Sequence, residues 1–475
     1  MQLLLLRMRR FSPVLIWLWL VSALCVTPCF GQGVIESNSF HGRFSLGLAY
    51  GPSRTLAPCL RLQSDSDLDI ARDDCGFAEG VIVYGREFFR SVGNQVWARG
   101  VVDLHLKTNM QRTWSDTQGS GDDALVLSNR NFYTETGNFL QHGEVIWFGN
   151  RSYDYEDLWL LDLRLLDQHG PGLGVQKIKL GIGEGGVAFF RVSSRLGGPA
   201  QDTLDLRWSG LPLFEGLGKL VFITTQTGSV DAKSGEKKYE AMSGWQTGFI
   251  YTWEDENLIH KWAVQYGKGL YGGSDTTSFN EGRGVALNDT GEERDPTYLM
   301  SDTHVEERLA MKKSHSFRLA DQLDVVPIES PWSLHVGAAY EQVDFGGLRY
   351  EKDAAFYRRG DMRTFTYALR PAYDLSTTYG FDVSLQNVRI DQGYGYRHRD
   401  PETGVEQLNR DPVDRRLQRL SLGFIIRPLA YGYAELRSYL AHSRWNDAVK
   451  RDITQGAFRT RSEGITGGLT LNIWW

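Results

Sequence analysis

Strict alternation of apolar and polar residues runs through most of this chain. In the stretch FHGRFSLGLAYG, one face carries Phe44, Leu46, Leu48 and Tyr50, and the residues between them form the other face. The stretches PWSLHVGAAYEQ, HKWAVQYG, RTFTYALRP and GFDVSLQNV keep the same period of two. This period predicts β-strands that each have one apolar and one polar face.

Glycine-rich or charged segments such as SDTQGSGDDA, QTGSVDAKSGEKK and GVALNDTGEERDP separate the predicted strands. Glycine contributes 52 of the 475 residues, more than the average of about 7% and a sign of many turns. No helical stripe of any length and no proline-rich linker interrupts the pattern. One all-β domain is therefore expected.

The number of strands favours a membrane barrel over a soluble sandwich. A sandwich rarely uses so many strands without a domain break. A transmembrane barrel needs about ten residues per strand, aromatic girdles and a polar interior, and the chain has 14 Trp, 21 Tyr and 23 Phe. We predict a transmembrane antiparallel β-barrel in an outer membrane. In the C-terminal LTLNIWW, alternation then puts Trp475 on the lipid face and Trp474 on the lumen face.

The N-terminus reads as a secretory signal peptide covering residues 1–31. Arg7, Arg9 and Arg10 precede an apolar stretch, and small residues follow near Gly31. Cleavage there leaves 475 − 31 = 444 residues, 32–475, as the barrel domain. No later segment has the roughly 18 consecutive apolar residues of a membrane helix. The net charge of -6 with mixed signs gives no basic stripe, so no nucleic-acid partner is expected.

Two cysteines remain after cleavage, Cys59 and Cys75. In an oxidising compartment they most simply form one disulfide, worth on the order of 3 kcal/mol. The alternatives are two free thiols or a metal site, but no second pair of Cys or His ligands lies nearby in the sequence. We expect no metal and no cofactor.

Several local signatures resemble the maltoporin-type sugar porins of bacterial outer membranes. They are FHG at the first strand, FAE after the cysteines, VIWFGNRSYDYEDLWLLDLRLLDQHGPGLG over residues 145–174, KWAVQYGKGL and the terminal IWW. The resemblance implies an 18-stranded trimeric barrel with a disulfide in its first long loop. It also implies passive diffusion of oligosaccharides along an aromatic lane with a polar track opposite. The implied partners are oligosaccharides, outer-membrane lipid and two further copies of the chain.

The resemblance also assigns site residues. Phe77 and Trp474 fall on the aromatic lane, as does Tyr431 or its neighbour Tyr433, and Trp114 takes the place of an aromatic that reaches into a neighbouring subunit. The implied polar track contains Arg72, Glu79, Asp157 and Asp162.

The chain departs from the family pattern at several of these positions. Arg43 replaces the first lane aromatic and Arg164 replaces a constriction tyrosine. A further lane position falls on Thr247, or on Trp245 or Phe249 if the alignment shifts. The two arginines fit a different sugar, an acidic sugar or a weakly selective pore. Alternatively, Arg164 pairs with Asp162 and only braces the constriction.

Three other functions are alternatives to a sugar porin. A barrel hydrolase would need a catalytic histidine such as His142, His260 or His335, but no GxSxG or HExxH motif is present. An energised importer would need a large plug ahead of the barrel, whereas the first predicted strand starts near Phe40. A general diffusion porin differs from a sugar-selective one because sugars do not block its ion current in a saturable way.

Overall fold

The structure is a computed structural model. It describes residues 38–50, 77–91, 95–109, 126–128, 131–153, 156–161, 163–166, 168–192, 201–227, 243–270, 312–344, 349–352, 355–399, 406–428, 433–447 and 462–474. The segment assigned to the signal peptide lies outside these ranges, and the described residues all belong to one unit that begins at Asn38. Within these ranges no helix is long and apolar enough to cross a membrane.

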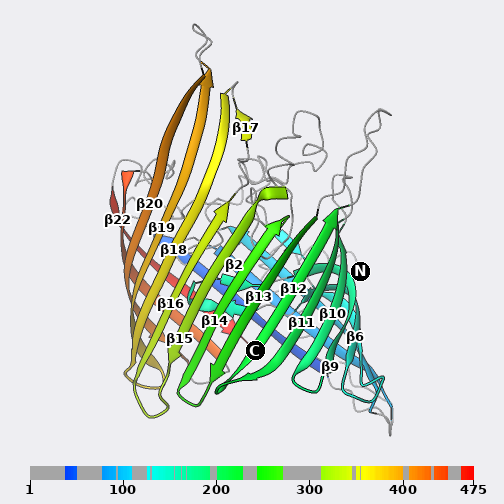
Figure 1. Ribbon diagram of the computed structural model, residues 1–475. Helices are drawn as coiled ribbons and strands as arrows, with labels where there is room; N and C mark the ends of the chain where they lie inside the picture. The colour runs from blue at the N-terminus through cyan, green and yellow to red at the C-terminus, as the bar shows by residue number, and fades with distance from the viewer. Residues whose placement is uncertain are drawn as a thin grey trace, which may run out of the picture. The chain divides into compact units, whose positions relative to one another are not determined.

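The described strands form one closed antiparallel barrel (Figure 1). Twenty strands share the sheet, of which β4 (Val126–Ser128) and β17 (Arg349–Lys352) are short additions, so 20 − 2 = 18 strands make the wall. The last wall strand pairs with the first through Arg43 and Trp474, which closes the barrel. The wall strands are β1 (Asn38–Tyr50), β2 (Phe77–Arg90), β3 (Trp97–Asn109), β5 (Phe132–Gly137), β6 (Val145–Tyr153), β9 (Gln168–Lys179), β10 (Glu184–Val192), β11 (Gln201–Leu213), β12 (Gly216–Thr227), β13 (Ser243–Glu254), β14 (Leu258–Gly269), β15 (His315–Val325), β16 (Trp332–Asp344), β18 (Ala355–Asp374), β19 (Tyr379–Arg399), β20 (Glu406–Ile426), β21 (Tyr433–Trp445) and β22 (Glu463–Trp474). The predicted 18-stranded antiparallel barrel is confirmed.

The two ends of the barrel differ in the length of their connections. At one end the turns are short, and only Phe214 and Glu215 join β11 to β12. At the other end the connections are long, and β18, β19 and β20 rise above their neighbours (Figure 1). Outer-membrane barrels carry their short turns on the periplasmic side. The lower end in Figure 1 is therefore the periplasmic end.

The outer face of the wall is an apolar belt of membrane thickness. On β20 to β22, Leu422, Leu440 and Leu469 are 55%, 57% and 42% exposed. Outward ion pairs mark the upper edge of the belt, for example between His442 and Glu463, and aromatic side chains mark its lower edge. The ten residue-to-residue steps from Glu463 to Ile473 along β22, at about 3.3 Å per step and a tilt of about 40°, span roughly 25 Å.

Candidate functional site

A segment between β6 and β9 folds back inside the barrel and narrows it. It contains β7 (Glu156–Leu158), the 3-10 helix η4 (Trp159–Leu161) and β8 (Leu163–Leu165), and β7 pairs with β8 in a separate two-stranded sheet. We call β7, η4 and β8 the constriction segment. Its buried leucines pack on inward residues from β12 to β18, and the cluster consists of Leu158, Leu160, Leu161, Leu163, Leu165, Leu166, Val221, Ile223, Ile250, Ala263, Ala320, Ala339 and Ala368.

Small residues on the inner wall make room for these leucines. A Cβ added at Gly337 would lie 3.1 Å from Cγ of Leu161, and one at Gly248 would lie 2.9 Å from Cδ2 of Leu166. Burying one leucine contributes about 1.5–3 kcal/mol. Gly337 and Ala339 lie on the strand face that alternation marked as non-apolar, yet they form the floor of this cluster. The constriction segment is thus held by apolar packing inside a polar barrel.

Polar contacts from Lys and Arg side chains fasten both ends of the constriction segment. Glu156 lies 3.4 Å from the Nζ atoms of Lys219 and Lys261 on β12 and β14. At the other edge Arg207 donates to the carbonyl oxygen of Leu166 at 2.9 Å. Since these partners lie on separate strands, the segment is attached to the wall at both edges and cannot shift without breaking charged contacts.

Trp159 is the aromatic side chain that the constriction segment presents to the lumen. Its indole Nε1–H donates to Asp324 at 3.2 Å, and its ring meets His335 edge-on with centroids 5.1 Å apart. The guanidinium of Arg370 lies 5.8 Å from the ring centroid. Even with these contacts, 44% of Trp159 stays exposed. An indole face beside a cation therefore lies open in the channel.

A charged cluster continues along the wall from Trp159. Asp382, whose side chain is fully buried, contacts Arg370 and accepts hydrogen bonds from Arg437 at 2.9 and 3.0 Å. Gly423 lies between the strands of this pair, and a Cβ there would lie 2.7 Å from Nε of Arg437. The Arg437 guanidinium also lies 5.4 Å from the ring centroid of Tyr439. Arg370 and Arg437 thus both contact the carboxylate of Asp382.

The next strands along the wall, β22 to β3, bring together several residues that the sequence had singled out. Glu79 on β2 is buried and lies 2.7 Å from His105 and 3.5 Å from Arg43. The Arg43 side chain is 47% exposed and is the register partner of Trp474. Trp474 shares the inner face of β22 with the buried Thr470 and is itself 40% exposed. Arg43 is therefore braced by Glu79 and also available to a molecule in the pore.

The other predicted residues are placed less fully. Asp157 is exposed on β7, with the backbone of Arg164 as its register partner on β8. Phe77 begins β2, and only its backbone is described. Outside the described residues lie Cys59, Arg72, Cys75, Trp114, Asp162 and Tyr431.

The lane position predicted on β13 is wrong. Thr247, Trp245 and Phe249 alternate with Gln246 and Ile250, which are buried at the inner face. All three candidates therefore point outward, away from the lumen. The three candidates are two positions apart, and residues two apart on a strand share one face. Exchanging one candidate for another therefore leaves the lane position on the outer face.

Sequence reasoning missed Trp159 and the charged cluster around Asp382. Trp159 lies in a leucine-rich run without alternation, and that break in period was the available signal for an inserted segment. The pairing of Asp382 with Arg370 and Arg437 had no signal, because the three residues lie on three strands.

Several solved outer-membrane channels are similar to this chain at low identity. OccAB1 of Acinetobacter baumannii is 11% identical, with 93% of this chain and 96% of that chain covered and a TM-score of 0.45. OccD3 (OpdP) of Pseudomonas aeruginosa is 11% identical, with 94% and 92% covered and a TM-score of 0.44. OmpT of Vibrio cholerae, in its trimer form, is 9% identical, with 93% and 99% covered and a TM-score of 0.35. Scores at this level support no argument about this chain.

A family model gives the assignment. The model of the LamB porin matches residues 82–475, which include every wall strand from β3 to β22 and most of β2. The matched part contains the constriction segment and the charged cluster around Asp382. The chain therefore belongs to the LamB porin family and is a porin of the bacterial outer membrane.

Proposed function

We propose that this porin is sugar-selective and gives oligosaccharides facilitated passive diffusion across the outer membrane. The observation that carries the proposal is the pair of half-exposed tryptophans inside the barrel, Trp159 and Trp474, each beside an arginine. Sugar rings have apolar C–H faces and a rim of hydroxyl groups. An indole stacks on the former and a charged side chain exchanges hydrogen bonds with the latter.

Weak, repeated contacts suit transport better than one tight site. Conduction requires that a molecule bind well enough to enter and loosely enough to leave. Trp159 offers one stacking face at the constriction segment and Trp474 another on β22. In the proposed lane, Phe77, Tyr431 and a neighbour's Trp114 add further aromatic positions. Along the proposed polar track, Glu79, Arg43 and Asp157 exchange hydrogen bonds with the sugar hydroxyls, together with Arg72, Asp162 and Arg164.

The working form proposed here is a trimer with a disulfide between Cys59 and Cys75. Native mass spectrometry of the detergent-extracted protein gives the subunit number. Thiol labelling of the unfolded protein, with and without a reductant, gives the state of the cysteines. A monomer, or two freely labelled thiols without reductant, contradicts the respective part of the proposal.

The main alternative is a general porin with weak selectivity. The half-exposed charge of Arg43 on the inner wall favours it equally, because pore water alone would solvate such a group. The discriminating property is saturable block of ion current by a sugar. We further propose that the barrel is a channel without enzymatic activity; ester or peptide hydrolysis that is abolished by replacing His335 would contradict this.

The deciding experiment is single-channel recording in a planar bilayer. The current is titrated with maltose, longer malto-oligosaccharides, sucrose and a uronic-acid oligomer. Saturable, concentration-dependent block by one class supports a sugar-selective porin and identifies the substrate class. Steady conductance without block by any of these sugars leaves a general porin.

A further inference from the structure

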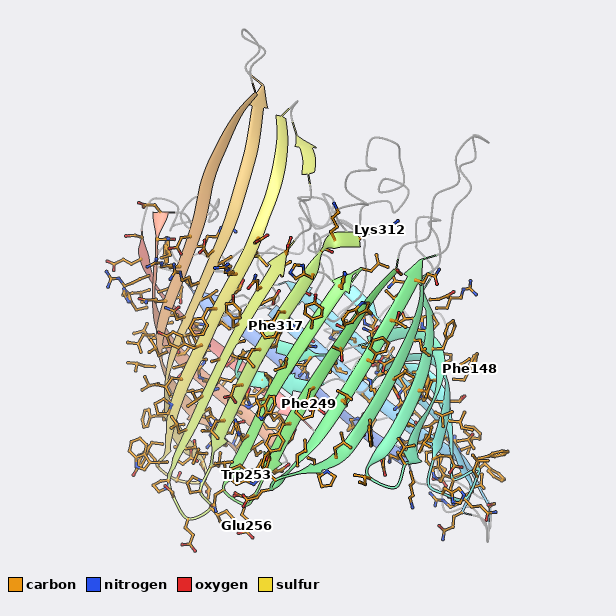
Figure 2. All side chains as sticks on the ribbon, viewed as in Figure 1. Phe148, Phe249, Trp253, Glu256, Lys312 and Phe317 are labelled. Carbon is orange, nitrogen blue, oxygen red and sulfur yellow. The ribbon has the colours of Figure 1, made fainter. Side chains whose placement is uncertain are left out.

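An apolar hollow lies on the lipid-facing side of the wall, at the periplasmic end of β11 to β14. Its volume is about 760 Å³, and it is lined by Leu213, Phe214, Glu215, Phe249, Tyr251, Trp253 and Trp262. Figure 2 shows Phe249 and Trp253 along β13, with Glu256 in the turn below them. This hollow plays no part in the pore, because its residues point away from the lumen.

Two glycines on β12 let the lining side chains lie close against the wall. A Cβ at Gly218 would lie 2.7 Å from Cδ1 of Leu213 and 3.1 Å from the Phe249 ring, and one at Gly216 would lie 2.6 Å from the Tyr251 ring. Both glycines therefore share the outer face with these side chains. On β14 the Trp262 ring packs against Phe249, with centroids 5.2 Å apart. The result is an apolar groove with aromatic walls.

Phe214 closes the lower end of the hollow in an unusual conformation. Its φ of 52° is in the left-handed region, which bulky residues rarely adopt. Its side chain is fully exposed in the two-residue turn. Aromatic side chains are favoured at the boundary between hydrocarbon and headgroups. A ring held in this position is suited to contact with lipid.

The rim of the hollow is acidic. Glu215 lines it, and Glu254, Asp255 and Glu256 follow in the adjacent turn. Residues 213–217 and 253–259 contain no Lys or Arg. The nearest lysines along these strands, Lys219 and Lys261, point inward to Glu156. The rim therefore attracts a cationic headgroup and repels an anionic one.

We propose that this hollow is a binding site for one phospholipid with a primary-amine headgroup, phosphatidylethanolamine, from the periplasmic leaflet. One acyl chain lies between the aromatic side chains that line the hollow. The ammonium group donates hydrogen bonds to Glu215 and to carboxylates of the neighbouring turn. Phosphatidylglycerol has a similar acyl region but an anionic headgroup. Its acyl chains therefore fit the hollow, but the acidic rim repels its negative charge.

The test is native mass spectrometry of the full mature protein with equal amounts of phosphatidylethanolamine and phosphatidylglycerol. We expect one retained phosphatidylethanolamine, preferred about fivefold for each carboxylate engaged. Glu215→Lys should reverse the preference towards phosphatidylglycerol. The matched control Glu329→Lys makes the same charge change in another periplasmic turn and should not. Equal retention of the two lipids by the unaltered protein overturns the proposal, as does an unchanged preference in Glu215→Lys.

A second pair of variants tests the acyl groove. Gly218→Leu displaces Leu213 and Phe249 from the lining of the hollow and should abolish preferential retention of phosphatidylethanolamine. Gly100→Leu on β3, where an added Cβ meets nothing within 4 Å, should retain the lipid as the unaltered protein does. If Gly218→Leu keeps the lipid but changes the mass of the oligomer, a second copy of the chain occupies the hollow and the proposal is wrong. Should Gly218→Leu fail to fold, the headgroup variants still decide.

Discussion

Replacing Trp159 by alanine should weaken sugar binding about tenfold. An indole offers about 250 Å² of surface, and the 44% exposed fraction leaves roughly 110 Å² of it free. A sugar that covers one ring face would bury about half of that area. At about 25 cal/mol per Å² the loss is close to 1.4 kcal/mol, which is tenfold in the dissociation constant.

The assay is the sugar concentration that blocks half of the ion current in a planar bilayer. Trp159→Phe keeps a ring but removes the N–H group that donates to Asp324. It therefore distinguishes the loss of stacking from a shift of the constriction segment caused by the lost hydrogen bond. We expect Trp159→Phe to lose less affinity than Trp159→Ala. Trp332→Ala is the matched control, because Trp332 is 59% exposed on the outer face, and its block should equal that of the unaltered protein.

Two results would refute the reasoning. If Trp159→Ala leaves the half-blocking concentration unchanged, the exposed indole does not bind sugar. If Trp159→Phe and Trp159→Ala lose affinity equally and also change the conductance in the absence of sugar, the hydrogen bond to Asp324, and not stacking, accounts for the effect.

Four further predictions follow from the same structure. Trp474→Ala should weaken sugar binding by about 1 to 2 kcal/mol, measured by the same block. Asp382→Asn removes the carboxylate from the buried guanidinium of Arg437 and from the partly exposed one of Arg370, so we expect a loss of about 3 kcal/mol of stability in urea unfolding and a reversal potential shifted towards anions. Gly337→Leu should displace Leu161, at a cost of about 1–3 kcal/mol, and change the single-channel conductance; an unaltered conductance would contradict the packing described. Burial would raise the pKa of Glu144, but backbone N–H donors of its turn hold that pKa below its ordinary value. The ionised carboxylate therefore stabilises the turn fully at any pH above the ordinary pKa of a glutamate. This stabilisation is lost as the pH falls through the lowered pKa of Glu144 in the folded protein. Amide exchange of residues 138–144 should show this loss, and Glu144→Gln should remove the pH dependence.

The strands themselves were predictable, because their faces meet solvents of opposite polarity. In PWSLHVGAAYEQ the outward Trp332 and Leu334 alternate with inward His335 and Gly337, as the period of two required. Alternation also placed the side chain of Trp474 in the lumen, next to Arg43. The prediction on β13 was wrong because matching a family position one residue out of phase exchanges the two faces of a strand.

The sequence by itself determined the barrel. An alternation of apolar and polar residues over so many strands is compatible with few folds other than a barrel with a polar interior and an apolar exterior. Local signatures also indicated the porin family, which the match over residues 82–475 confirmed. Only the tertiary structure decided what lies inside. The leucines of the constriction segment read as an ordinary apolar run until glycines and alanines of distant strands were found beneath them. Likewise, Asp382 acquires its partners from β18 and β21, and such a contact depends on barrel closure and strand register, which no local pattern encodes.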